Sequence, residues 1–373
     1  MVMNLDLANP ADVSQEQLRN ESRAAMYDAI QNIAVGPDRG RDISRDLASL
    51  VMRGILDGQI DDIQTAVFLI ALRMKRESLN EFLGLFDALL QSVDCQLAEV
   101  DEVVVLADPF DGYSRTITMT PFIPSVLSAC GYFPVIHGVE TVGPKHGVTA
   151  HKVFKLAGID TRRTPKAVAT DLTSIGWGYV DQSSYAPALY KLQSLRNRII
   201  KRTALTTLER LLVPIRGNKN THLVLGYVHK AYPEIYATVA KAAAFNGVLL
   251  LKGVEGGLAP ALNKPLRRFR FIGDLPDDID SEKQRLELDV LFGAKSAAMK
   301  TDDQGDAVYQ CLETGLDVLN GKKSLARDSL CLASAQIMNA YGSGLSLPKA
   351  VEKVQLCLDN GAAKERFNAA ISP

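Results

Sequence analysis

The chain has 373 residues, with 42 lysines and arginines against 43 aspartates and glutamates, and so a formal charge of −1. Its 47% hydrophobic and 23% charged content is ordinary for a globular protein and excludes a disordered, collagen-like or small disulfide-bonded chain. Single hydrophobic cores stop growing near roughly 250–300 residues, so the length predicts two domains.

Hydropathy and cysteine usage indicate the compartment. The longest apolar runs, such as residues 66–72, are far shorter than the ~20 residues that cross a bilayer. Residues 1–9 lack the basic flank and apolar core of a signal peptide, so we expect a cytoplasmic protein that does not bind membranes. The five cysteines show no Cys-x-x-Cys spacing and no histidine at ligand spacing, which excludes a disulfide framework and a structural zinc site.

Helical periodicity dominates the first hundred residues. A polar, partly helical leader is expected over residues 1–39, followed by an N-terminal helical domain over 40–98. Serine followed three residues later by glutamate predicts a reciprocal capping box at a helix start. The expected helix boundaries are a cap at Asp42, a stop at Gly58, a start at Asp61 or Asp62, and the capping box of Ser78 with Glu81.

From Glu102 the pattern changes to short continuous apolar runs, which are typical of buried strands. Helical stretches separate these runs, and this alternation predicts an α/β domain over 99–373 with a mainly parallel central sheet flanked by helices. The expected strands are Val103–Leu106, Phe133–Ile136, Gly178–Val180, Leu223–Val228 and Val248–Leu251. The expected closing helices lie near Asp303–Asn320, Ser324–Tyr341 and Leu347–Asn360, with Gly361 ending the last.

Charge is distributed unevenly along this α/β region. Eight basic residues and one acid lie between Lys191 and Lys219, and a second basic group surrounds Arg267 and Arg268. The stretch Asp274–Asp289 holds seven acids and two basic residues. A neutral total therefore conceals a strongly basic segment, which could bind phosphates or pair with the acidic stretch of another copy.

Three short motifs resemble the anthranilate phosphoribosyltransferase-like family (glycosyltransferase family 3). They are Leu-Asp-Gly at 56–58, Ala-Leu-Arg-Met-Lys at 71–75 and Asp-Asn-Gly-Ala-Ala at 359–363. Arg196, Arg202 and Thr203 also match the family's R-x-x-x-x-x-R-T helix. The resemblance, over roughly residues 40–365, implies a phosphoribosyltransferase/nucleoside phosphorylase-like fold, a homodimer formed through the helical domain, and residues 186–215 packing back toward that domain.

The donor-binding motifs depart from the family's pattern. The family's G-T-G-G-D loop, which cradles pyrophosphate with backbone amides, matches here only at Asp111 and Gly112. Pro109 supplies no amide, Phe110 adds bulk and Asp108 would repel a phosphate. The residues that keep the outline of this pocket are Asp111, Gly112, Thr120, His137, Gly138, Lys145 and Gly147.

The family's metal and acceptor motifs are also replaced. Leu258 and Ala259 stand approximately where the family has the paired Asp-Glu that binds magnesium, and Glu255 is the carboxylate that remains nearby. The stretch Ser183–Pro187 lacks both histidines of the family's acceptor segment. We therefore expect no metal, no cofactor and no catalytic residue. Magnesium and phosphoribosyl pyrophosphate belong only to the alternative interpretation, a transferase with an altered donor loop and an unidentified acceptor.

The same pattern of loss resembles a divergent branch of the family described as dimeric nucleic-acid-binding proteins. This second resemblance rests mainly on residues 119–139 and 195–214. It predicts a catalytically silent homodimer that contacts nucleic acid phosphates without reading sequence, although a basic run can also be a solvated helix face and Arg196 can be structural. The candidate phosphate-binding residues are Lys191, Arg196, Arg198, Lys201, Arg202, Arg210, Arg267 and Arg268.

Overall fold

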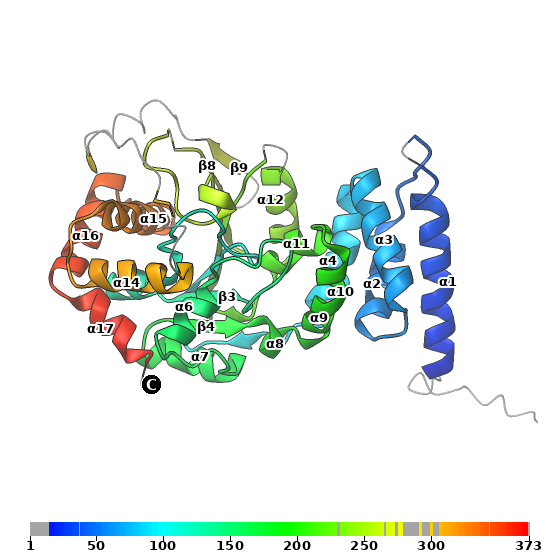
Figure 1. The fold of residues 1–373 in the computed structure, drawn as a ribbon, viewed down its shortest axis with the longest axis horizontal. Coiled ribbons are helices and arrows are strands. Elements are labelled where there is room, and N and C mark those ends of the chain that lie inside the picture. The colour runs from blue at the N-terminus through cyan, green and yellow to red at the C-terminus, as the bar shows by residue number, and fades with distance from the viewer. Residues whose placement is uncertain are drawn as a thin grey trace, which may run out of the picture. The chain divides into compact units, whose positions relative to one another are not determined.

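The computed structural model describes residues 15–36, 38–229, 232–264, 266–272, 275–278, 291–292, 299–300, 306–342 and 344–371. The chain forms two compact units, Met1–Ser92 and Val93–Pro373 (Figure 1). Apart from the backbone of 275–278, the acidic stretch Asp274–Asp289 lies outside the described residues, as does 1–14 of the predicted leader.

The first unit is helical. Its helices are α1 (Gln15–Ile33), α2 (Arg45–Leu56), α3 (Asp62–Lys75) and α4 (Leu79–Gln91). Asp61 caps α3, and the predicted capping box of Ser78 and Glu81 is confirmed at the start of α4. The predicted cap at Asp42 is wrong, because Ser44 accepts the amide of Leu47 at 3.1 Å and caps α2. Asp42 pairs instead with the ammonium of Lys75.

The second unit contains all five predicted strands. Its strands are β1 (Gln96–Leu97), β2 (Glu102–Ala107), β3 (Pro134–Gly138), β4 (Gly178–Asp181), β5 (Ile215–Arg216), β6 (Asn220–Gly226), β7 (Gly247–Leu251), β8 (Arg268–Ile272) and β9 (Leu275–Asp278). Within the described residues, seven of them form one sheet in the order β4-β3-β2-β6-β7-β8-β9, and β1 pairs with β5. The five strands from β4 to β7 are parallel, while β8 and β9 run antiparallel, so the predicted mainly parallel sheet is confirmed.

Helices flank this sheet. They are η1 (Thr120–Phe122), α5 (Ile123–Ala129), α6 (Ala150–Leu156), α7 (Pro165–Ser174), α8 (Gln182–Tyr185), α9 (Pro187–Lys191), α10 (Gln193–Ile199), α11 (Ala204–Leu208), η2 (Glu209–Leu211), α12 (Tyr232–Ala242), η3 (Val254–Gly256), α14 (Ala307–Leu319), α15 (Leu325–Tyr341), α16 (Leu347–Asp359) and α17 (Ala362–Ala369). Figure 1 shows α14 to α17 gathered on one side of this unit. Ser324 caps α15, and Gly361 follows α16 with a left-handed φ of 82°, as the sequence predicts. The prediction that α16 is the last helix is wrong, because α17 begins directly after Gly361.

The core lies on both faces of the sheet, as a parallel sheet requires. Every residue from Val103 to Ala107 of β2 is buried. Alternate residues, including Val104 and Leu106, pack in one large cluster with α5 and α14 to α17. Nowhere in the described part of the chain is a helix both long and apolar enough to span a membrane.

Strand register brings the carboxyl ends of the central strands to one edge. Ala107 of β2 lies beside His137 of β3 and Leu225 of β6, and Gly226 of β6 lies beside Leu251 of β7. The loops that leave these ends are therefore neighbours, and ligands of open α/β sheets bind at this edge.

Candidate functional site

The loop after β2 is fixed by an apolar contact at its centre. Phe110 is buried with Val139 and Val142 from the loop after β3, and its ring meets His137 edge-on at a centroid distance of 5.4 Å. His137 bonds through Nδ1 to the hydroxyl of Tyr185 at 2.8 Å. Burial, followed by the charge of Arg210, lowers the pKa of His137 to about 3, so this imidazole is neutral near pH 7.

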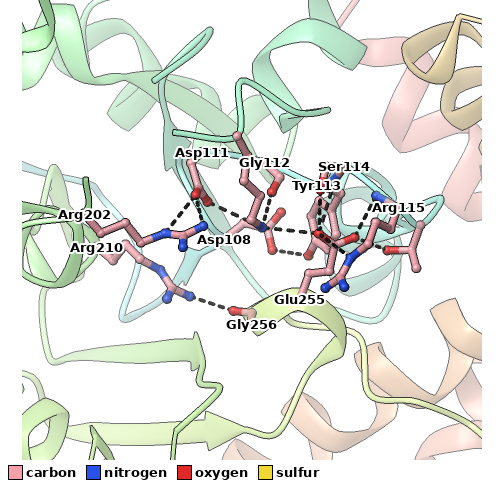
Figure 2. Close-up of polar contacts among 12 residues, drawn as sticks. Asp108, Asp111, Gly112, Tyr113, Ser114, Arg115, Arg202, Arg210, Glu255 and Gly256 are labelled. Atoms are coloured by element: carbon pink, nitrogen blue, oxygen red, sulfur yellow. Dashed lines mark hydrogen bonds and ion pairs between the residues drawn. The ribbon is translucent and has the colours of Figure 1, made fainter. Parts of the chain in front are cut away.

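Asp111 lies at the centre of an ion-pair network (Figure 2). Its buried carboxylate accepts from Arg202, whose Nε lies 3.0 Å away, and lies 3.7 Å from the ammonium of Lys145. Lys145 also donates to the carbonyl of Gly112 at 2.7 Å, and the amide of Gly147 donates to the carbonyl of Asp111 at 2.9 Å. The structure thus brings four of the seven donor-pocket residues together, but their charges neutralise one another.

The other three lie apart from these ion pairs. Thr120 bonds to the hydroxyls of Tyr113 and Thr118, at 3.2 and 3.1 Å. His137 lies beneath the loop against Phe110. Gly138 ends β3 beside the ring of Tyr179.

The second carboxylate of the site is Glu255, on the glycine-rich loop after β7. It accepts from the amides of Ser114 and Arg115 at 3.2 and 3.1 Å, and from the hydroxyl of Thr116 at 2.9 Å. The ammonium of Lys145 lies 3.3 Å from it and so joins it to Asp111. Although burial acts in the opposite direction, these hydrogen bonds and the charge of Lys145 hold the pKa of Glu255 below its usual value.

A buried carboxyl group, Asp108, lies behind this network. The hydroxyl of Tyr113 donates to it at 2.7 Å, and Arg210 is the nearby charge. Burial raises the pKa of Asp108 to about 6, and the hydrogen bond from Tyr113 and the charge of Arg210 only partly oppose that rise. Tight packing fixes this arrangement, because a Cβ on Gly257 would lie 1.6 Å from the Tyr113 hydroxyl.

Magnesium and a diphosphate, which the family resemblance implies, do not fit the residues present. Leu258 and Ala259 are buried and supply no ligand oxygen. Asp111 and Glu255 already pair with cations, and the buried Asp108 bonds to the Tyr113 hydroxyl. In the part of the chain that the structure describes, no cluster of three or more acidic, histidine or cysteine side chains could hold a metal ion. Ala259 instead helps to line a mainly apolar pocket, together with Tyr113, Thr118, Leu262 and Leu325.

The basic segment between Lys191 and Lys219 is divided among several short elements. It runs from the end of α9 through α10, α11, η2 and β5, and Ile200 ends α10 with a left-handed φ of 63°. Lys191, Arg198, Lys201 and Arg202 are exposed. Asn197 on α10 accepts the amide of Gly143 at 3.1 Å, which joins this segment to the loop after β3.

Three of the eight candidate phosphate-binding residues are buried, which corrects the expectation that they face outward. Arg196 forms two 2.7 Å bonds with the buried carboxylate of Glu209. Arg210 donates to the carbonyls of Ala107 and Gly256 at 2.9 and 3.1 Å. Arg268 donates to the side chain of Asn339 at 2.6 Å, whereas Arg267 beside it is exposed.

Sequence reasoning does not find the partners in this site. It places Arg202 on a basic surface, although Arg202 pairs with Asp111, 91 residues away in the chain. Glu255 contacts residues 114–116, which lie about 140 positions earlier in the chain, so no short sequence motif contains both partners. The single usable signal is that Glu255 is the carboxylate left near the altered metal motif.

Comparison with known proteins identifies the family. Residues 22–93 match the glycosyl transferase family helical bundle domain, and residues 111–364 match the glycosyl transferase family a/b domain. The chain belongs to this glycosyl transferase family. The predicted resemblance to glycosyltransferase family 3 and the predicted fold class are thereby confirmed.

Relatives of this glycosyl transferase family member cover most of its length. An uncharacterized protein from Aquifex aeolicus is 31% identical over 228 residues, or 61% of this chain and 68% of the relative. An anthranilate phosphoribosyltransferase from Delftia acidovorans is 23% identical over 337 residues, covering 89% of this chain and 93% of that enzyme.

Solved structures share the fold. The anthranilate phosphoribosyltransferase from Thermus thermophilus has a TM-score of 0.70 at 17% identity, covering 93% of this chain and 98% of that one. The enzyme from Saccharomyces cerevisiae, solved in complex with PRPP and Mg, also gives a TM-score of 0.70 at 15% identity, covering 95% of this chain and 99% of that one. These matches show that the architecture of the transferases has been kept.

Proposed function

We propose that this family member does not transfer phosphoribosyl groups and instead binds nucleic acid through its phosphates, without reading base sequence. The observation that carries the proposal is the ion-pair network of Asp111, Lys145, Arg202 and Glu255. In this network Lys145, Asp111 and Glu255 pair with one another inside the site, so they are not free to hold a donor diphosphate and its metal. Transfer depends on free donors and a metal at the leaving group.

The same network extends into a surface rich in cations. We define the basic rim as Arg115, Arg198, Lys201 and Arg202, whose side chains are exposed, whereas Lys145 lies partly buried between Asp111 and Glu255. Arg202 and Lys145 share Asp111, while Lys145 and Arg115 share Glu255, with the Arg115 guanidinium 3.9 Å from that carboxylate (Figure 2). Arg198 and Lys201 are exposed beside Arg202 in the chain. Cations gathered in this way bind a phosphate backbone by releasing its counterions.

The transferase alternative has one observation in its favour, which is that Asp111, Gly112, Lys145 and Gly147 still lie together. Calorimetry with phosphoribosyl pyrophosphate and Mg²⁺ separates the two functions. We expect no metal-dependent heat of binding. Metal-dependent heat would support a transferase, whereas binding of ribose phosphates without metal would support a metabolite sensor.

Fluorescence anisotropy with labelled oligonucleotides tests nucleic acid binding. We expect log affinity to fall steeply with log salt, and unrelated sequences to bind alike. The R198E/K201E variant should lose roughly tenfold or more in affinity and flatten the salt slope by about two. The control K349E/K364E changes the net charge equally at exposed positions on α16 and α17 and should bind normally. No binding at ~50 mM salt would reject the proposal.

We further propose that the protein acts as a cytoplasmic homodimer formed through its helical unit. The support is an apolar stripe on α3, where Ile63 is 77%, Val67 43% and Met74 74% exposed. These side chains recur at helical spacing and so lie on one face. A dimer would place two copies of the basic rim on one particle.

A further inference from the structure

The carboxylate of Glu255 accepts hydrogen bonds from one short segment, residues 114–116, and from Lys145. Two successive amides, those of Ser114 and Arg115, point at its carboxylate, and the Ser114 hydroxyl at 3.3 Å adds to the Thr116 hydroxyl. Successive backbone amides that converge in this way form a nest for anions. The ammonium of Lys145 at 3.3 Å completes a set of donors that would equally suit the oxygens of a phosphate.

The loop holds this carboxylate in place against a backbone preference. Glu255 has φ 51° and ψ 18°, in the left-handed region that non-glycine residues rarely adopt. Glycines lie on both sides of it, at 253, 256 and 257, yet position 255 itself is a glutamate. Its side chain is only 3% exposed. The turn at Glu255 therefore places its buried carboxylate against the amides of Ser114 and Arg115.

The charges around Glu255 show that its carboxylate excludes a phosphate. Lys145, Arg115 and Arg202 bring three positive charges, which Asp111 and Glu255 only partly neutralise. An incoming phosphate would meet the negative charge of Glu255 at the donors it needs. Without Glu255, three cations would face the single carboxylate of Asp111, with two amides and two hydroxyls unpaired.

We propose that Ser114, Arg115, Thr116 and Lys145 form a binding site for a phosphoryl group, and that Glu255 is a built-in carboxylate plug that closes it. The plug is a property of this chain's own loop and does not depend on the proposed nucleic acid binding. A phosphoryl ligand enters only when Glu255 withdraws or is replaced.

Isothermal titration calorimetry with inorganic pyrophosphate, without metal, tests the plug. We expect no measurable binding to the unaltered protein and at least tenfold tighter binding to E255G, because glycine accepts φ 51° and removes both the charge and the bulk. E255Q, which keeps the shape and removes the charge, should bind more weakly than E255G but better than the unaltered chain. E255Q also carries the test if E255G does not fold.

Two controls make the result specific. D101N removes one carboxylate from an exposed ion pair with Lys219 at the amino end of β2 and should gain no pyrophosphate binding. The double variant E255G/K145M should lose most of the gained binding, because the ammonium of Lys145 lies nearer to the Glu255 carboxylate than the guanidinium of Arg115 does. Unchanged binding in both folded Glu255 variants, or equal binding by the unaltered protein, would overturn the plug.

A comparison of two oligonucleotides, one with a 5′-phosphate and one with a 5′-hydroxyl, distinguishes the possible sources of the phosphoryl group. A 5′-phosphorylated oligonucleotide that gains more affinity for E255G than its 5′-hydroxyl counterpart indicates a nucleic acid end, whereas a gain for pyrophosphate alone indicates a free phosphate. Absence of both gains overturns the plug but leaves the proposed nucleic acid binding intact. If the unaltered protein binds no nucleic acid while E255G gains affinity for pyrophosphate, only the proposed function is rejected.

Discussion

At the scale of single residues, Asp108 links the buried polar cluster to a measurable pH dependence. Its folded-state pKa of about 6 lies above the unfolded value of about 3.8. A carboxyl group with a raised pKa stabilises the fold while protonated, and that stabilisation is lost as the pH rises through 6. Asp108→Asn keeps an acceptor for the Tyr113 hydroxyl but cannot ionise. The variant should therefore not lose stability as the pH rises through 6.

We expect the stability advantage of D108N over the unaltered protein to grow by about 1 kcal/mol between pH 5 and pH 8. Denaturant unfolding followed by circular dichroism at each pH measures it. D101N, in an exposed ion pair, is the control and should show no such growth. An advantage that is the same at both pH values would contradict the raised pKa.

At the scale of elements, Arg196 joins α10 to η2 rather than facing a ligand. Its ion pair with Glu209 is almost fully buried, with side chains 5% and 0% exposed. Removing one partner of a buried pair leaves an unpaired charge, so Arg196→Ala should cost about 3–5 kcal/mol of unfolding free energy. R196M/E209L, which removes both charges, should recover at least half of that loss.

An exposed pair provides the matched comparison for Arg196. Lys219→Ala breaks the ion pair with Asp101, whose side chains are 70% and 64% exposed, and should change stability by less than about 1 kcal/mol. Thermal and urea unfolding of the three variants decides the matter. A loss for Arg196→Ala as small as that for Lys219→Ala would show that Arg196 is not a structural residue.

Local patterns predict the strands but not the site. A continuous apolar run such as Val103–Leu106 is stable as a strand buried on both faces between two layers of helices. The sequence therefore locates β2 even though it does not show which strands pair with it. Arg196 and Arg198 look alike in the sequence, yet one is buried and the other exposed. The burial of Arg196 depends on its partner Glu209, which lies thirteen residues later in the chain. It also depends on a left-handed turn at Ile200, a position where the sequence has no glycine to predict such a turn.

At the scale of the whole molecule, the proposed homodimer can form by one of two kinds of contact. The charges of the sequence suggest pairing between the basic segment and Asp274–Asp289, whereas the family resemblance implies contact through the helical unit. The exposed stripe of Ile63, Val67 and Met74 on α3 favours the apolar route. Apolar contact persists in salt, whereas contact between exposed charges is screened.

We therefore expect light scattering to give twice the 40.6 kDa chain mass at both 0.1 and 0.5 M salt. The variant I63E/M74E should shift the protein to the monomer mass, because two carboxylates cannot be buried unpaired in an apolar interface. L356E, which alters a side chain 61% exposed on α16, is the control and should remain dimeric. Dissociation of the unaltered protein at 0.5 M salt would instead favour charge pairing, and a monomer at every salt concentration would remove the dimer from the proposed function. The basic rim would then bind as a single copy, and the salt slope of nucleic acid binding would count the cations of one chain only.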